Sequence, residues 1–235
     1  QFSVGRLQAG SDDGNIAFNA GTDLDGTQFA AYFNDDWTVN EKLSLNGGLR
    51  ISGFNNDNNF SYGIEPRFSM KYSATDNISL KASYARMKQY LHLVSNSGAS
   101  LPTDIWIPSS DVVKPQIGMQ YSVGYFRNFK ENKYESSVEV YYKDMQNQVE
   151  YAEGALPEQN LVDNPDNQFT FGRGNSYGVE LFLKRKVGRI NGWVGYTWSK
   201  TTRTFPEING GRPFPAKFDR RHDLSIVGIY EYSKR

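Results

Sequence analysis

The chain has 235 residues and no cysteine, which excludes a disulfide framework and a cysteine-based zinc or redox site. Its 26 basic and 26 acidic residues balance, so charge gives no reason to expect a nucleic-acid partner. Mean hydropathy is −0.63. Apolar runs of about five residues exclude a membrane-spanning helix, which needs ~20. A transmembrane β-strand escapes this test, because half of its residues face a polar lumen.

Regular alternation of apolar and polar residues predicts long β-strands. It is clearest from Tyr62 to Tyr72, where the even positions are apolar or aromatic and the odd positions are mostly polar or charged. The same period of two occurs, in chain order, over residues 43–54, 115–128, 134–143 and 177–187. Several of these strands exceed the ~5–6 residues of a typical globular strand. Each apolar stripe tends to end in an aromatic residue, as the girdles of outer-membrane barrels do. The pattern predicts an all-β chain that forms an antiparallel transmembrane barrel wall.

The predicted connections alternate in length. The short ones are residues 40–42, 75–77, 130–133 and 188–191, and the longer ones are 55–61, 91–114, 153–173 and 205–219. Residues 1–27 are expected to form one more long loop. Short periplasmic turns and long extracellular loops are the usual layout of an outer-membrane barrel. The alternation therefore predicts which end of each strand faces the cell exterior.

The strand count predicts a segment of a larger barrel. About nine or ten strands are expected, no linker divides the chain, and neither end carries a terminal-strand signature. The chain opens without a signal peptide, as a mature chain or a fragment would. We therefore expect residues 1–235 to be one segment of a barrel domain.

Five short stretches carry a family resemblance. They are FAAYFNDDW at 29–37, LSLNGGLR at 43–50, KASYAR at 81–86, YGVEL at 177–181 and DRRHDL at 219–224. In this order they resemble strands of the C-terminal barrel of TonB-dependent outer-membrane transporters, especially those of Bacteroidetes. The resemblance covers most of the chain but only about half of such a barrel.

The resemblance implies active import across the bacterial outer membrane. In the family, a plug domain fills a 22-stranded barrel, loops and plug capture a scarce nutrient, and TonB pulls on the plug. The implied partners are outer-membrane lipid, the protein's own plug and remaining strands, TonB through that plug, and a surface lipoprotein. The plug and the other strands have no counterpart in this sequence. The resemblance implies no cofactor and no enzymatic activity, and the substrate cannot be read from the chain.

Charged residues on the polar faces of the strands are candidates for a solute path or for contact with the plug. They are expected to form ion pairs with one another and with the plug. The candidates are Arg50, Glu65, Arg67, Lys71, Glu139, Lys143, Glu180 and Lys184, with Glu135 as a further member of the set.

Aromatic residues in the predicted loops are candidates for ligand contact. Trp106 is the best of them, because a polar loop seldom places an indole among apolar neighbours without burying it. The alternative is that the loop packs on itself or on a neighbouring loop. The same two interpretations apply to Phe169, Phe171, Phe205 and Phe214.

Catalytic and metal sites are not expected. The two histidines, His92 and His222, have no third partner that the sequence locates. Acidic stretches at residues 23–26 and 163–167 are better interpreted as turns than as calcium loops. Asp35 breaks the alternation, because it falls in register with apolar residues. Either it lies near the periplasmic interface, or a bulge turns it inward.

Two other functions stay open. A complete small barrel of about ten strands could be an outer-membrane protease or a lipid-modifying enzyme. A soluble β-sandwich could be a binding module. The length of the gene separates both from a transporter.

Overall fold

The computed structural model describes residues 7–9, 18–20, 26–56, 59–94, 105–152 and 168–232. Antiparallel strands make up most of these residues. Among them, no helix is long and apolar enough to cross a membrane.

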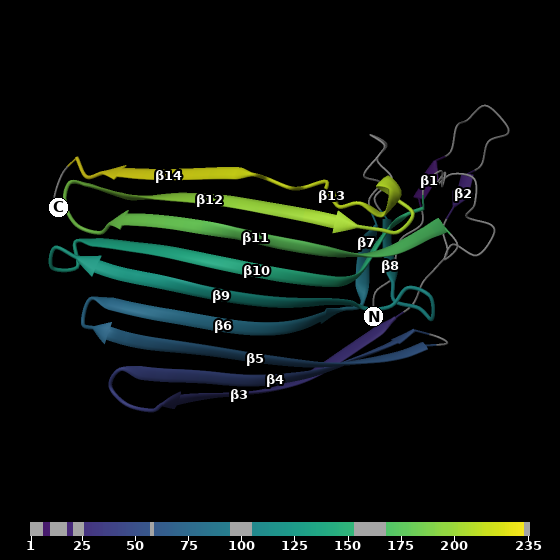
Figure 1. The fold of residues 1–235 in the computed structure, drawn as a ribbon, viewed down its shortest axis with the longest axis horizontal. Helices are drawn as coiled ribbons and strands as arrows, with labels where there is room; N and C mark the ends of the chain where they lie inside the picture. Colours follow the sequence, from purple (N-terminus) through teal and green to yellow (C-terminus); the bar gives the residue numbers. More distant parts are fainter. Residues whose placement is uncertain are drawn as a thin grey trace.

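One sheet of ten strands forms the body of the structure (Figure 1). Its order is β13-β12-β11-β10-β9-β6-β5-β4-β3, and β14 also pairs with β12. The strands are β3 (Thr27–Thr38), β4 (Leu43–Asn56), β5 (Asn59–Thr75), β6 (Ile78–Gln89), β9 (Gln116–Phe129), β10 (Tyr134–Tyr151), β11 (Phe169–Arg185), β12 (Ile190–Thr204), β13 (Phe214–Pro215) and β14 (His222–Tyr230). The predicted antiparallel wall is confirmed.

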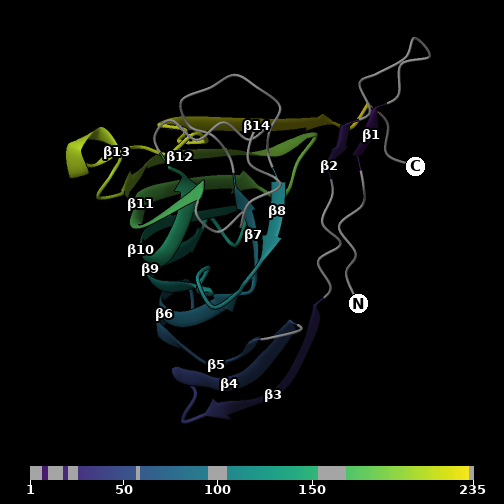
Figure 2. The ribbon, with the colours of Figure 1, turned by 90° about the vertical axis from the view of Figure 1, so that its right-hand side faces the viewer.

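The sheet is curved and open (Figure 2). It has a convex face, seen in Figure 1, and a concave face behind it. Among the described strands, β3 pairs only with β4 and β14 only with β12. We call the end with the short connections the turn end and the opposite end the loop end. The turn end lies at the left of Figure 1.

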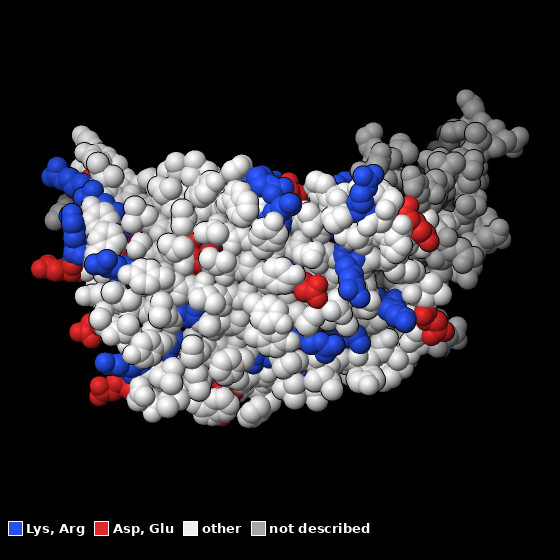
Figure 3. All heavy atoms as spheres, viewed as in Figure 1, with Lys and Arg blue, Asp and Glu red and all other residues white. Residues whose placement is uncertain are grey.

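The convex face carries the apolar residues. The even residues predicted for one face of β5 pair with apolar residues of β4, as in Ile64 with Ile51 and Met70 with Leu45. Figure 3 shows a mostly uncharged centre on this face, with charged side chains gathered toward both ends. This distribution is that of a band that faces lipid.

A row of tyrosines crosses the convex face toward the loop end. Register places Tyr84, Tyr121, Tyr142 and Tyr177 side by side on four neighbouring strands. Phe129 stacks on Tyr134 near the turn end, with ring centroids 5.2 Å apart. From Tyr121 to Phe129 the strand rises about 27 Å, or about 20 Å after a barrel's tilt, close to the ~25 Å apolar band of a barrel. We call Tyr84, Tyr121, Tyr142 and Tyr177 the tyrosine row.

Asp35 lies on the convex face without a bulge. It pairs directly with Gly47, and the β3–β4 register is continuous from Thr27 to Thr38. A Cβ on Gly47 would lie 3.1 Å from the ring of Trp37, so this ring covers the glycine next to Asp35. The inward bulge is therefore wrong.

The connection predicted over residues 55–61 is too long. β4 and β5 stay paired up to Asn56 and Asn59, which leaves a link of two residues. Connection length therefore does not alternate strictly along this chain.

The loop end contains structure that alternation does not predict. Within the predicted loop 91–114, β7 (Leu91–Val94) pairs with β8 (Ile105–Pro108) on the concave side of the sheet (Figure 2). In the first predicted loop, β1 (Leu7–Ala9) pairs with β2 (Phe18–Ala20). The acidic stretches at 23–26 and 163–167 lie outside the described residues, apart from Gly26.

Candidate functional site

The predicted charged residues all fall on the polar, concave face. Register places them opposite other inward-facing positions, as in Lys143 opposite Ser176 and Lys184 opposite Glu135. Arg67 lies opposite Gly48, and its side chain runs over that glycine.

At one level of this face, across β5 to β11, basic residues lie on one side and acidic residues on the other; we call this level the separated row. Lys71 pairs with Lys81 and, two strands further on, Glu139 pairs with Glu180. Gly124 of β9 lies between the two pairs. Lys81 Nζ lies 4.1 Å from the centroid of the Phe126 ring. The structure records no ion pair for Glu139 or Glu180 with another described residue. Like charges directly opposite each other destabilise a sheet, so this row is suited to contact a surface of opposite charge.

A buried polar network lies nearer the loop end. Arg50 Nη1 donates to both carboxylate oxygens of Glu65, at 3.0 and 3.2 Å. Ser52 Oγ donates to Glu65 Oε1 at 2.5 Å, so its own oxygen is left to accept from Tyr90, whose hydroxyl lies 2.8 Å away. Tyr90 also stacks on Phe54, with ring centroids 5.5 Å apart. Glu65 is therefore held by two donors, and its own side chain is only 2% exposed.

A second buried ion pair joins two residues that sequence reasoning missed. Arg203 Nη1 of β12 donates to Glu150 Oε2 of β10 at 2.9 Å. Glu150 lies beyond a register shift at Asn147, whose φ is 55°. The extra residue changes which face each later residue of β10 takes. In the sequence, Asn147 was the residue that could have indicated this register shift, since asparagine is among the few residues that tolerate a positive φ.

The β7–β8 hairpin packs onto the end of β10 and β11. Its contacts form a buried apolar group that we call the loop-end cluster, with Phe171 packed against it; the cluster comprises Val94, Ile107, Val113, Val149, Tyr151 and Phe169. His92 of β7 is fully buried, and its Nε2 lies 2.8 Å from Ser109 Oγ. Its Nδ1 has no hydrogen-bond partner among the described residues. Burial lowers the pKa of His92 to about 4, so this imidazole is neutral at physiological pH.

The predicted aromatic candidates divide into one exposed and four packed residues. Trp106 on β8 is 47% exposed and so can reach a solute. Phe169 and Phe171 are not loop residues, because β11 begins at Phe169, eight residues before the predicted start of the strand at Tyr177. Phe205 is fully buried, and its ring centroid lies 6.0 Å from that of Phe214 on β13. Phe169 and Phe205 are buried and Phe171 and Phe214 are partly buried, so all four rings pack at strand ends.

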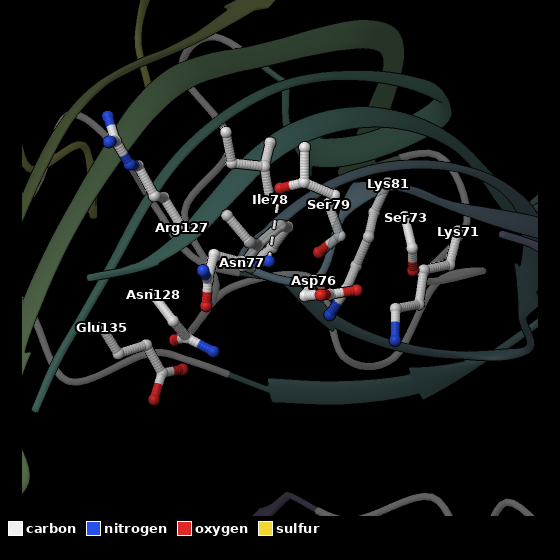
Figure 4. Close-up of a pocket in the computed structure, with 12 residues that line it drawn as sticks. Lys71, Ser73, Asp76, Asn77, Ile78, Ser79, Lys81, Arg127, Asn128 and Glu135 are labelled. Carbon is white, nitrogen blue, oxygen red and sulfur yellow. Dashed lines mark hydrogen bonds between the residues drawn. The ribbon is translucent and has the colours of Figure 1, made fainter. Parts of the chain in front are cut away.

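Two cavities lie next to these residues. A cavity of about 420 Å³ at the loop end is lined by Asn147, Phe171, Arg173, Pro206 and neighbouring residues. Another of about 220 Å³ lies at the turn end (Figure 4). There Lys71, Lys81 and Glu135 extend to one side of the sheet, whereas Arg127 points to the other. The turn-end cavity therefore adjoins the row of separated charges.

The family model for TonB dependent receptor-like β-barrels matches residues 2–234. This chain belongs to that family. The predicted outer-membrane barrel is thereby confirmed, and neither a soluble sandwich nor a small enzymatic barrel is supported. No curated protein matches the chain.

Solved structures of outer-membrane receptors share the fold. The ferripyoverdine receptor of Pseudomonas aeruginosa is 16% identical over 94% of this chain and 29% of its own, with a TM-score of 0.62. The alcaligin receptor FauA of Bordetella pertussis is 18% identical over 90% of this chain and 35% of its own, with a TM-score of 0.60. The ferric-catecholate import receptor Fiu of E. coli K12 is 15% identical over 93% and 34%, with a TM-score of 0.62. The chain thus spans about a third of each receptor, and each is described as a receptor and not as an enzyme.

Proposed function

We propose that this chain forms part of the wall of an outer-membrane transporter that imports a scarce nutrient by TonB-coupled movement of a plug. The observation that carries the proposal is the row in which Lys71 and Lys81 are separated from Glu139 and Glu180. A lumen that held only water would leave each like-charged pair uncompensated. A plug that presents carboxylates to β5–β6 and basic groups to β10–β11 would neutralise both.

The other partners follow from the same proposal. TonB acts through the plug, and further strands pair with the open edges β3 and β14, because unpaired backbone groups in lipid cost several kcal/mol each. Lipid covers the convex face. A surface lipoprotein stays a prediction. The loop end faces the cell exterior, where Trp106 contacts the substrate.

A ferric siderophore is the first substrate to test, because the similar receptors named above take such ligands. Cells that lack this gene should lose uptake of one radiolabelled ferric chelate, and cells that lack TonB should lose the same uptake. Unchanged uptake of every tested siderophore, vitamin, peptide and glycan would refute import as the function.

Charge reversal tests the role of the separated row. The double variant Glu139→Lys/Glu180→Lys should abolish uptake while the protein still reaches the outer membrane. The matched control is Glu131→Lys, in the exposed turn between β9 and β10. Equal uptake by both variants would argue against a plug surface of opposite charge.

A further inference from the structure

Apolar side chains cover part of the concave face near the turn end, where the lumen of a barrel is usually polar. Phe182 of β11 follows the inward-facing Glu180 by two residues and so shares its face. Trp193 of β12 pairs with the inward-facing Lys184. The ring centroids of Phe182 and Trp193 lie 5.9 Å apart. A Cβ on Gly195 would lie 3.5 Å from the Trp193 ring and 3.9 Å from the Phe182 ring, so both rings converge over this glycine.

Two aliphatic residues of β14 extend this surface to the edge of the sheet. Val227 pairs with Trp193, and Ile229 follows Val227 by two residues on the same face. Val227 is 40% exposed and Ile229 is 52% exposed. Both side chains therefore present apolar surface to the lumen.

An aromatic residue of β9 extends the surface in the other direction. Ser137 of β10 pairs with Phe126 on one side and with Phe182 on the other. Ser137 is only 8% exposed between these two neighbours. We call this surface the lumen apolar band; it comprises Phe126, Phe182, Trp193, Val227 and Ile229.

The position and width of the lumen apolar band limit what can cover it. It lies next to the separated row, on the turn-end side, and Phe182 is about 17 Å along β11 from Tyr177 of the tyrosine row. Four strand spacings, about 19 Å, separate Phe126 on β9 from Val227 on β14. Lipid does not reach the inner face of a closed barrel, and a small solute does not span this width. A folded body inside the lumen is the partner that fits.

The β5–β6 side of the wall is polar at the same level. Ser73 pairs with Ser79, next to the Lys71–Lys81 pair, and all four residues line the turn-end cavity (Figure 4). Salt screens a contact made by exposed charges, whereas it does not screen the burial of apolar surface. A body in the lumen is therefore held by apolar contact on β9–β14 and by charge on β5–β6.

We propose that the lumen apolar band is the seat on which the plug stays anchored when TonB pulls, and that the plug leaves the β5–β6 side first. The occupant is an apolar segment of the plug flanked by basic groups, because Glu139 and Glu180 adjoin the band on its loop-end side. The plug then turns about the β11–β14 side, and a path opens beside Lys71 and Lys81. This inference rests on the proposed function, which places a plug in the lumen.

The test measures maleimide labelling of single cysteines in the full-length receptor, purified in detergent without other cysteines. Trp193→Cys and Val227→Cys report on the band, and Ser73→Cys and Ser79→Cys report on the β5–β6 side. At 20 mM salt, all four should react at least tenfold more slowly than in the urea-unfolded receptor. At 1 M salt, the two β5–β6 cysteines should react at least fivefold faster, whereas the two band cysteines should change less than twofold.

The same four cysteines report on the movement in cells. Cells that contain TonB and receive the ferric chelates of the uptake assay should show faster labelling on the β5–β6 side alone, and cells that lack TonB should show none of this increase. Equal acceleration at both sides, or at neither side in either experiment, overturns the proposal.

A pair of double variants tests the apolar contact itself. Phe182→Ala/Trp193→Ala removes both rings and should speed the labelling of Val227→Cys at least fivefold at 20 mM salt. The matched control Leu183→Ala/Val194→Ala removes a directly paired couple from the opposite face of the same two strands and should change it less than twofold. Equal urea midpoints show that both variants fold. Equal labelling of both variants overturns the seat.

Failure of this inference and failure of the proposed function give different results. Band cysteines that react freely in a receptor that still imports its substrate remove the seat and leave transport standing. Protected band cysteines, together with normal uptake by Glu139→Lys/Glu180→Lys, remove the charged contact and leave the seat standing.

Discussion

Arg50 Nη1 lies 3.0 Å from Glu65 Oε2 on the neighbouring strand, and the two side chains differ in exposure: 29% for Arg50 and 2% for Glu65. Removing Arg50 leaves a buried carboxylate without its cation, whereas removing Glu65 leaves a guanidinium that still reaches water. We expect Arg50→Ala to lower the free energy of unfolding by about 3–5 kcal/mol, and Glu65→Ala by clearly less. Urea unfolding of the receptor in lipid vesicles measures both values.

The control for this prediction is an exposed ion pair. Lys186 and Glu135 lie 2.8 Å apart, and both are more than one-third exposed. Lys186→Ala should therefore cost at most ~1 kcal/mol. Equal losses for Arg50→Ala and Lys186→Ala would contradict the importance of burial.

Acid should loosen the β7–β8 hairpin. Burial lowers the pKa of His92 to about 4, below the ~6.5 of an unfolded chain, so the folded hairpin holds fewer protons in this interval. The free energy of unfolding of the hairpin should be highest above about pH 6.5. It should fall by roughly 3 kcal/mol in total as the pH drops to about 4. Hydrogen exchange of the β7 and β8 amides at several pH values measures the loss. His92→Gln should abolish the pH dependence, whereas His222→Gln, at the exposed histidine of β14, should leave it unchanged.

Substitution of Trp106 should affect substrate binding, whereas substitution of Phe205 should affect the stability of the fold. Trp106 is 47% exposed, so Trp106→Ala should weaken substrate binding at least tenfold and leave the unfolding midpoint unchanged. Phe205 is fully buried against Phe214, so Phe205→Ala should destabilise the protein by about 3–5 kcal/mol. Calorimetry of substrate binding and urea unfolding provide the two readouts. A Trp106→Ala variant that binds normally would remove this residue from the substrate site.

Labelling of single cysteines tests the orientation of the wall. The chain contains no cysteine, so each introduced thiol is the only one in it. Asn209→Cys lies at the loop end and should react with an impermeant maleimide on intact cells, whereas Thr75→Cys lies at the turn end and should react only after lysis. The opposite result would place the turn end outside.

The regular part of this fold was predictable from sequence, because a strand with one apolar and one polar face shows its period directly. The long strands, their facing and the four short turns at the turn end follow from that period, whereas the two-residue link between β4 and β5 and the strands β7 and β8 do not. The early end of the ladder between β5 and β6 does not follow from it, because Arg86 and Lys88 keep the alternation of the strand while the residue pairs stop at Arg67 and Ala85. The ion pair between Glu150 and Arg203 does not follow from the period either. The extra residue at Asn147 reverses which face of the sheet the later residues of β10 occupy.

The candidate site was predictable in composition but not in contacts. The sequence indicates which charges share a face, yet the pairing of Arg50 with Glu65 depends on the β4–β5 register. The aromatic candidates mislead for another reason. Phe169 and Phe171 follow a polar stretch, so alternation alone cannot show that β11 already begins there.

Gly124 has an electrical consequence for the wall. It places the Cα atoms of Lys81 and Glu139 two strand spacings, about 10 Å, apart, and the Glu139 side chain leans over it. Among the described residues no ion pair joins the basic and acidic pairs, so the wall carries a transverse dipole that points along its circumference. A body inside the barrel with its own fixed dipole has one favoured rotation about the barrel axis. A polar solute that passes this height is turned in the same sense.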